Sequence, residues 1–237
     1  MNKKTILTIL AIIITTITIQ KGVAMPEETI EHIKGTSYSK VCKNGKCGIQ
    51  DDYENRLVSD IKYDNIEKVG ETAYFKVKIG DKYAMYSIMH QQEVSAFKFD
   101  NIAPISEDHS DYLKVSIDGK WAILDLRLNK YLSDYKYDKI DNMPWNSFFK
   151  VYIGDKLGLF YLERGSNFER SREVIPPTYD EILQLDSHKY FKISKNGLWG
   201  IYDILKKAVV IEPKYSNNDL QYDKWGYFFI KGQKVEL

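Results

Sequence analysis

Tyr190-Phe-Lys-Ile-Ser-Lys-Asn-Gly-Leu-Trp-Gly-Ile-Tyr-Asp203 carries the pattern that decides the fold. Alternating polar and apolar residues flank Asn196-Gly197, a pair that supplies the positive φ angles of a tight hairpin turn. The stretch therefore predicts two antiparallel β-strands joined by a two-residue turn. Four other stretches share the pattern, and they begin at Lys40, Tyr74, Tyr112 and Phe148.

The five copies recur at a nearly constant period. Their aligned lysines are Lys40, Lys76, Lys114, Lys150 and Lys192, so the steps are 36, 38, 36 and 42 residues. Each of the first four copies is followed by an aromatic-Asp tail: Tyr63-Asp64, Phe99-Asp100, Tyr137-Asp138 and Tyr179-Asp180. In the fifth copy the tail becomes Tyr215-Ser216. A period in this range, held five times, indicates a tandem-repeat protein.

We predict an all-β tandem array of about five three-stranded units plus a partial sixth. The units lie near residues 38–66, 74–102, 112–140, 148–182 and 190–218, and the partial unit covers 225–237. Residues 30–33 resemble a tail without its strands, so the two ends could together close a six-bladed β-propeller. Three strands are few for a propeller blade, which favours the open array.

Residues 196–203, Asn-Gly-Leu-Trp-Gly-Ile-Tyr-Asp, followed by 210–215, Val-Ile-Glu-Pro-Lys-Tyr, resemble a unit of the bacterial WG-repeat family. Residues 118–123 of the third unit are a near match, whereas the Trp position of the other units holds Cys47, Tyr83 and Leu157. The resemblance covers roughly residues 35–237. It implies an all-β repeat domain of bacteria, often exported, whose members mostly lack a defined biochemical activity.

The first 24 residues have the three parts of a secretory signal. A basic head is followed by the uncharged stretch Thr5–Ile19 and then by Gly22-Val23-Ala24. We expect cleavage between Ala24 and Met25, which leaves residues 25–237 as an exported domain in the periplasm or outside the cell. The alternative is a retained membrane anchor, but 15 residues are fewer than the roughly 20 needed to cross a bilayer.

The balance of basic and acidic side chains argues against nucleic acid as a partner. The chain has 34 basic and 33 acidic side chains, and removal of the three lysines of the leader leaves 31 against 33. A nucleic-acid-binding protein would show a clear basic excess, so we expect no nucleic-acid partner. We also expect no stable membrane insertion after signal cleavage.

Cys42 and Cys47 are the only cysteines, and Asn44-Gly45 lies between them. In a two-residue hairpin turn they face each other as a non-hydrogen-bonded pair, close enough for a disulfide. An exported chain reaches a compartment where such a bond persists. The alternative is a pair of free thiols or of metal ligands.

Catalytic and metal-binding motifs are missing from the sequence. Its four histidines are widely separated, no Cys-x-x-Cys cluster or phosphate-binding glycine loop occurs, and we expect no metal and no cofactor. The tail aspartates Asp64, Asp100, Asp138 and Asp180 recur beside an aromatic residue, which indicates turn caps rather than catalytic carboxylates. The repeated aromatics are likewise expected to be packing residues.

Two features interrupt the repeat. The insertion Glu163–Arg172 explains the 42-residue step, and its Arg164, Phe168, Arg170 and Arg172 form our candidate binding loop, with a solvated loop as the alternative. Trp145 lies in a linker where the pattern gives it no core role. We expect a non-enzymatic protein that binds another protein or a cell-surface polymer. The alternative is an exported propeller-type hydrolase or lectin with a loop-built site.

Overall fold

A computed structural model describes residues 28–106, 111–143, 147–163, 171–185 and 189–236. Within these ranges every regular element is a β-strand, and no helix could span a membrane. The first sheet contains β1 (Glu28–His32), β2 (Tyr38–Lys43), β3 (Lys46–Asp51) and β4 (Arg56–Leu57). The second contains β5 (Asn65–Lys68), β6 (Tyr74–Ile79), β7 (Lys82–Ser87) and β8 (Gln92–Glu93). The third contains β9 (Asn101–Pro104), β10 (Tyr112–Ile117), β11 (Lys120–Asp125) and β12 (Lys130–Tyr131).

The remaining three sheets continue the series. The fourth contains β13 (Lys139–Asn142), β14 (Phe148–Ile153), β15 (Lys156–Tyr161) and β16 (Arg172–Tyr179). The fifth contains β17 (Glu181–Gln184), β18 (Tyr190–Lys195), β19 (Leu198–Asp203) and β20 (Ala208–Tyr215). The sixth has three strands, β21 (Leu220–Tyr222), β22 (Phe228–Ile230) and β23 (Gln233–Val235). Within the sheets, neighbouring strands run antiparallel, for example β2 with β3 and β10 with β11.

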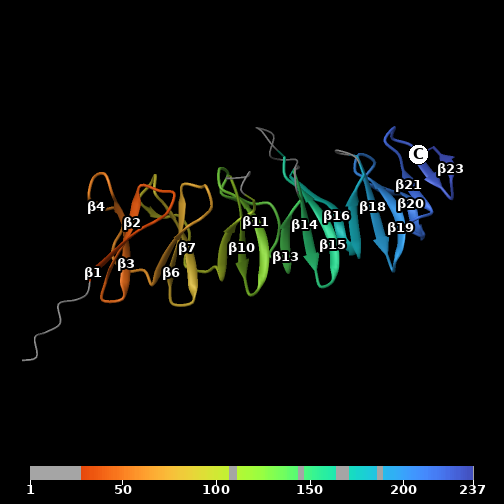
Figure 1. Ribbon diagram of the computed structural model, residues 1–237. Helices are drawn as coiled ribbons and strands as arrows, with labels where there is room; N and C mark the ends of the chain where they lie inside the picture. The colour runs from red at the N-terminus through yellow and green to blue at the C-terminus, as the bar shows by residue number, and fades with distance from the viewer. Residues whose placement is uncertain (1–27, 107–110, 144–146, 164–170, 186–188, 237) are drawn as a thin grey trace, which may run out of the picture.

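The six sheets stand in a row in chain order, with the first and the sixth at opposite ends (Figure 1). The predicted all-β tandem array is therefore confirmed, and the alternative of a closed six-bladed ring is wrong. The ring required residues 30–33 to complete the last unit. Instead β1 pairs along its whole length with β2, from Glu28 opposite Lys43 to His32 opposite Ser39, so this strand belongs to the first sheet.

The expectation of three strands per unit is also wrong, because the first five sheets each have four. The additional strand follows the aromatic-Asp tail and pairs with the hairpin after it, as Ile66 of β5 does with Val77 of β6. These strands are short, and β5 buries only Ile66, so alternation in the sequence did not reveal them.

The hairpin turns have the conformations that their sequences predicted. Asn44-Gly45, Asp118-Gly119 and Asn196-Gly197 have positive φ at both residues, between 51° and 76°. Gly80 and Gly154 have positive φ (60° each) at the first turn position only. Two-residue turns with these angles match the twist of the strands they join. They also fix the register that places Cys42 opposite Cys47.

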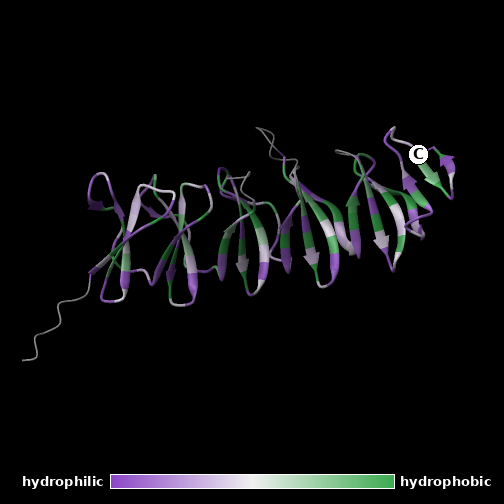
Figure 2. Cartoon of the chain, in the orientation of Figure 1, coloured by the Kyte–Doolittle hydropathy of each residue, from purple (hydrophilic) through white to green (hydrophobic). Residues whose placement is uncertain are grey.

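The hydrophobic core lies between consecutive sheets. Ile49 of the first sheet packs in one cluster with Val77 and Tyr86 of the second, and comparable clusters fill the later gaps. Hydrophobic and hydrophilic residues alternate along the strands in Figure 2, as expected when one side chain in two faces a neighbouring sheet. The tail aromatics Tyr63, Phe99, Tyr137 and Tyr179 are buried in these gaps, which confirms them as packing residues.

A small residue follows the Trp position because the backbone of the fourth strand of the sheet lies close to it. A Cβ added to Gly200 would meet the Ile211 carbonyl oxygen and would lie 2.7 Å from the Pro213 nitrogen. Gly158 has the same surroundings, at 2.6 Å from the Pro177 nitrogen. The close approach expected from the sequence is therefore present in the fourth and fifth sheets.

A repeated pair of contacts, here called the hairpin staple, joins the hairpins of consecutive sheets. Asp64 pairs with Lys46 Nζ of the preceding hairpin (2.5 Å) and accepts a hydrogen bond from the Gly80 N–H of the next turn (2.7 Å). The equivalent trios are Lys82, Asp100 and Gly119; Lys120, Asp138 and Gly154; and Lys156, Asp180 and Asn196. The aspartates are thus turn caps, as predicted, and each caps the turn of the following sheet. The lysine and the backbone N–H hold the pKa of all four carboxyls below the usual range.

Gly200→Ala is expected to lower the free energy of unfolding by about 2–3 kcal/mol, because the added methyl overlaps backbone atoms that cannot move aside. Gly48→Ala is the matched control at the same repeat position. Its Cβ would lie 3.0 Å from the Asp60 carbonyl oxygen, so we expect a smaller loss of about 1 kcal/mol. Urea unfolding followed by tyrosine and tryptophan fluorescence measures both, and equal losses would contradict the close-approach explanation.

The staples also predict a pH dependence. Because the folded pKa of each staple aspartate is below the unfolded value of about 3.9, its stabilisation is present above pH ~4 and is lost as the pH falls through the folded pKa. A variant with Asn at positions 64, 100, 138 and 180 should melt at a lower temperature at pH 7 and change less between pH 5 and pH 2. Thermal melts by circular dichroism test this, with Asp81→Asn as a control outside the staples. Parallel pH profiles of variant and wild type would refute the assignment.

Candidate binding surface

The structure places only part of the predicted binding loop. Arg164, Phe168 and Arg170 lie outside the described residues, as do Trp145 and the expected cleavage point at Ala24 and Met25. Arg172 is the first residue of β16, and the Glu163 N–H donates to Ser171 Oγ (2.9 Å). Arg172 and Glu163 help to line a pocket of about 270 Å³ between the fourth and fifth sheets.

The histidines and cysteines of the described residues have ordinary structural partners. His32 Nδ1 lies 3.0 Å from Asp52 Oδ2, and His90 Nδ1 lies 3.0 Å from Ser87 Oγ. Cys42 and Cys47 form the predicted disulfide, with their Cα atoms 4.0 Å apart. The Cys47 N–H donates to the Tyr63 carbonyl (2.7 Å), away from Cys42, which fits the non-hydrogen-bonded pair expected. Across the ranges that the structure describes, no three His, Cys, Asp or Glu side chains gather as metal ligands.

Three of the five aligned lysines stack on the aromatic residue at the Trp position of their own hairpin. The ammonium lies 5.3 Å from the ring centre for Lys76 and Tyr83, 5.7 Å for Lys114 and Trp121, and 5.2 Å for Lys192 and Trp199. Such cation–π contacts stabilise the face between two sheets. The Trp of the repeat is therefore a packing residue, and Trp199 is only 7 % exposed.

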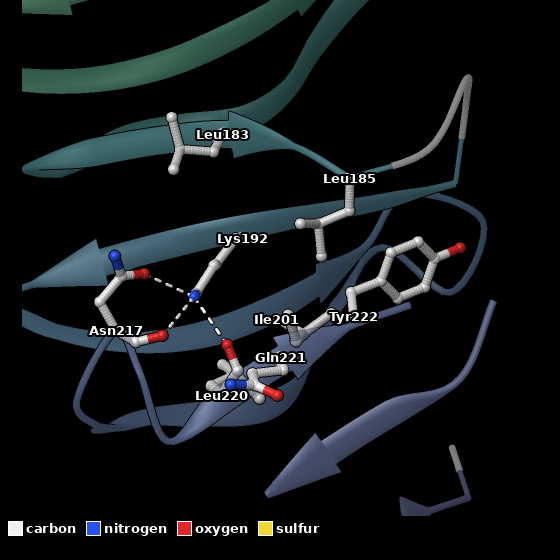
Figure 3. Close-up of a pocket in the computed structure, with 8 residues that line it drawn as sticks. All are labelled: Leu183, Leu185, Lys192, Ile201, Asn217, Leu220, Gln221 and Tyr222. Atoms are coloured by element: carbon white, nitrogen blue, oxygen red, sulfur yellow. Dashed lines mark hydrogen bonds between the residues drawn. The ribbon is translucent and has the colours of Figure 1, made fainter. Parts of the chain in front are cut away.

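Lys192 also lines a pocket of about 410 Å³ between the fifth and sixth sheets (Figure 3). Its ammonium donates to the Asn217 carbonyl (3.0 Å), to Asn217 Oδ1 (2.6 Å) and to the Leu220 carbonyl (2.7 Å). Burial lowers the pKa of this lysine. Since these three bonds use all three donors of an ammonium, Lys192 clamps the sixth sheet onto the fifth and has no donor left for a ligand.

A groove of about 460 Å³ opens where the first and second sheets meet along their fourth strands. Tyr63 Oη donates to Glu93 Oε1 (2.5 Å), and Lys62 Nζ lies 2.9 Å from the same oxygen. Burial and the bond to Glu93 raise the pKa of Tyr63. Burial also acts to raise the pKa of Glu93, but the bonds from Tyr63 and Lys62 outweigh it and the pKa is lowered. The carboxylate is therefore held ionised between a phenol and an ammonium.

The junction of the third and fourth sheets repeats this arrangement in a groove of about 310 Å³. Tyr137 Oη donates to Glu173 Oε2 (2.7 Å), and Lys136 Nζ lies 2.8 Å from that oxygen. Burial, followed by the bond to Glu173, raises the pKa of Tyr137. The two grooves, named groove A (sheets one and two) and groove B (sheets three and four), thus have the same Tyr-Lys-Glu trio.

The junctions between and after the grooves lack this trio. At the second junction Phe99 replaces the tyrosine and Tyr131 the glutamate, and Lys98 lies 5.2 Å from the Phe99 ring centre. At the fourth junction Val209, the strand partner of Tyr202, takes the place of the glutamate and packs in one cluster with Tyr179. Sequence reasoning missed the grooves, although Asp60-Ile-Lys-Tyr-Asp64 and Asp134-Tyr-Lys-Tyr-Asp138 repeat 74 residues apart, at twice the basic period.

Solved structures with a similar arrangement share little sequence with this chain. Dihydro-heme d1 dehydrogenase NirN is 13% identical over 83% of this chain and 49% of its own, with a TM-score of 0.37. Hsv2 of Kluyveromyces lactis is 8% identical over 85% of this chain and 71% of its own, with a TM-score of 0.36. This chain spans about half the length of NirN, and at these TM-scores neither similarity carries an argument about function. No curated protein matches the sequence.

A family model gives the direct match. The model described as WG containing repeat matches residues 90–121 and 171–199. The first match runs from the end of the second sheet to Trp121, and the second runs from the start of β16 to Trp199. Both therefore end at the Trp position of a hairpin, where the repeated pattern is strongest. Two of the repeat units of this chain therefore match the WG containing repeat model.

Proposed function

We propose that the protein is an exported, non-enzymatic binding protein that presents one long side of its array to a protein or a cell-surface polymer. The observation that carries this proposal is a row of exposed apolar side chains in the turns between third and fourth strands. They are Tyr53 (87 % exposed), Met89 (78 %), Leu128 (50 %) and Leu205 (72 %). We call these four residues the turn row.

The turns do not need the turn row in order to fold. In three of them an aspartate at the end of the third strand accepts the backbone N–H groups of the turn, as Asp51 Oδ1 does from the N–H of Tyr53 (2.9 Å). Asp125 and Asp203 act in the same way on Arg127 (2.9 Å) and Leu205 (2.8 Å). Single exposed apolar residues are common on protein surfaces, but their recurrence in the same turn of four sheets marks an interaction surface.

Export is supported by two features of the chain. The leader has the three-part pattern of a secretory signal, and the described domain contains a disulfide between its only cysteines. Disulfides persist in oxidising compartments and are rare in the cytosol. We therefore propose cleavage after Ala24 and release of the domain into the periplasm or the exterior.

The alternative of a hydrolase or lectin with a site at the mouth of a propeller loses its basis, because the array is open (Figure 1). In an open row, loops of distant units do not converge on one point. An extended side that offers the same positions repeatedly fits binding along a long partner instead. Lack of catalytic turnover remains a prediction of this proposal.

Substitution of the turn row tests the binding proposal. A variant with Ser at Tyr53, Met89, Leu128 and Leu205 should lose most of its co-sedimentation with the envelope fraction of the producing cells. Its melting temperature should stay nearly unchanged, because these side chains are solvent-exposed. The matched control places Ser at Ile79, Ile153 and Leu198, which are 37 %, 38 % and 43 % exposed at the opposite, hairpin edge. Loss of binding in the control alone, or in neither variant, would refute the proposed side.

Export has its own test. When the full chain is produced in a bacterium, intact mass spectrometry of the periplasmic and medium fractions should find a form that begins at Met25 and carries no free thiol. The contrary result is a cytoplasmic chain that retains the leader and has two alkylatable cysteines.

A further inference from the structure

We infer that grooves A and B are paired subsites for one linear, uncharged polymer rich in hydroxyl or amide groups, that is, a neutral polysaccharide. The inference rests on the proposed binding function and adds the class of ligand. It is carried by the match between the two grooves, by their low net charge and by the different chemistry of the junction between them.

The two grooves have the same residue type at five equivalent positions. Ser59, Asp60, Lys62, Tyr63 and Glu93 line groove A, and the same five residue types line groove B. The residues of groove B are Ser133, Asp134, Lys136, Tyr137 and Glu173. At the lip, apolar Leu57 (43 % exposed) corresponds to Tyr131 (38 % exposed).

The intervening junction shows which of these residues the fold requires. There Ser95 keeps the backbone role of Ser59 and Ser133, since each hydroxyl accepts an N–H of the neighbouring strand. Lys98 is also retained, whereas Ala96, Phe99 and Tyr131 replace the aspartate, tyrosine and glutamate. Packing of one sheet on the next therefore does not require the aspartate, tyrosine and glutamate. Their presence again in groove B reflects a requirement other than packing.

The low net charge of the grooves argues against a strongly charged ligand. Groove A contains Lys62 between Glu93 (2.9 Å) and Asp60 (3.6 Å), so these three groups have a net charge of only −1. Groove B contains Lys136 with Glu173 (2.8 Å), together with Asp134 and Arg172, two charges of each sign. A polyanion or a polycation would gain no consistent attraction from the pair.

The exposed groups suit a sugar ring. The Asp60 side chain is 83 % exposed and that of Lys62 is 41 % exposed, so both reach solvent as acceptor and donor. Asp134 is exposed in groove B, and its Lys136 side chain is 39 % exposed. Hydroxyl groups can donate to these carboxylates and accept from these ammonium groups, while the apolar lip covers the C–H face of the ring.

Spacing favours a polymer over two separate small ligands. Sheets that pack face to face lie about 10 Å apart, so grooves separated by two steps of the row lie roughly 20 Å apart. A chain several sugars long can occupy both at once. Linked binding of this kind exceeds the affinity of either groove alone.

Titration with three soluble neutral polysaccharides tests the inference: glycol chitin, hydroxyethyl cellulose and dextran, each with its hexasaccharide. The variants are Asp60→Ala, Asp134→Ala and the double variant in the full mature protein, and Asp81→Ala is a matched exposed control. For at least one sugar we expect one hexasaccharide to bind per protein across both grooves, and each single substitution to weaken both hexasaccharide and polymer binding at least tenfold. The double variant should not bind, and the control should bind as wild type.

Three results would overturn the inference. These are binding of none of the three polymers, polymer binding that the double variant retains, and a preference for heparin or for unfolded casein over every neutral sugar. The proposed function is judged separately by co-sedimentation with the envelope fraction. If the wild type still binds that fraction through the turn row while all sugars fail, only the ligand class is wrong.

Discussion

Burial of two apolar faces per sheet is the constraint on which the rest of this structure depends. Each interior sheet has large apolar residues on the side that meets the preceding sheet, such as Phe75 and Tyr86 or Phe149 and Phe160. A four-stranded unit of this kind cannot bury both faces alone, so it requires a neighbour on each side. The first sheet has Ser39 and Gln50 at these two positions, which gives its outer face the polar character of a cap.

Stacking alone would leave adjacent sheets free to slide, and the hairpin staples oppose this. Each staple ties the lysine of one hairpin and the turn N–H of the next to a single aspartate, so the hairpin tips stay in line along one edge of the row. The series ends at the fifth sheet, where Leu198 replaces the lysine and Ser216 the aspartate. There the buried ammonium of Lys192 binds Asn217 and Leu220, so another interaction holds the shortened sixth sheet.

The sequence predicted what a single unit encodes. The turn pairs predicted the hairpins, Asn44-Gly45 predicted the Cys42–Cys47 bond, and the period predicted the tandem array. It did not predict the strand Asn65–Lys68, because one buried isoleucine in four residues has no detectable periodicity. It also missed the grooves, because Tyr63 and Glu93 meet from different units, 30 residues apart. Such a contact can be predicted only when it is known which residues of one sheet face which residues of the next.

Comparison of the first and third junctions, which have the Tyr-Lys-Glu trio, with the second, which lacks it, separates the residues that the fold needs from those that a function needs. Placing a tyrosine, a lysine and a glutamate where two sheets meet partly desolvates two charges, a cost that their mutual attraction offsets only with good geometry. At the second junction of the same chain Phe99 is buried and Lys98 lies 5.6 Å from the Tyr131 ring centre, so two sheets pack there without a glutamate. Stability alone therefore gives no reason for the polar trio at the first and third junctions. A ligand that contacts both the first and the third junction does give such a reason.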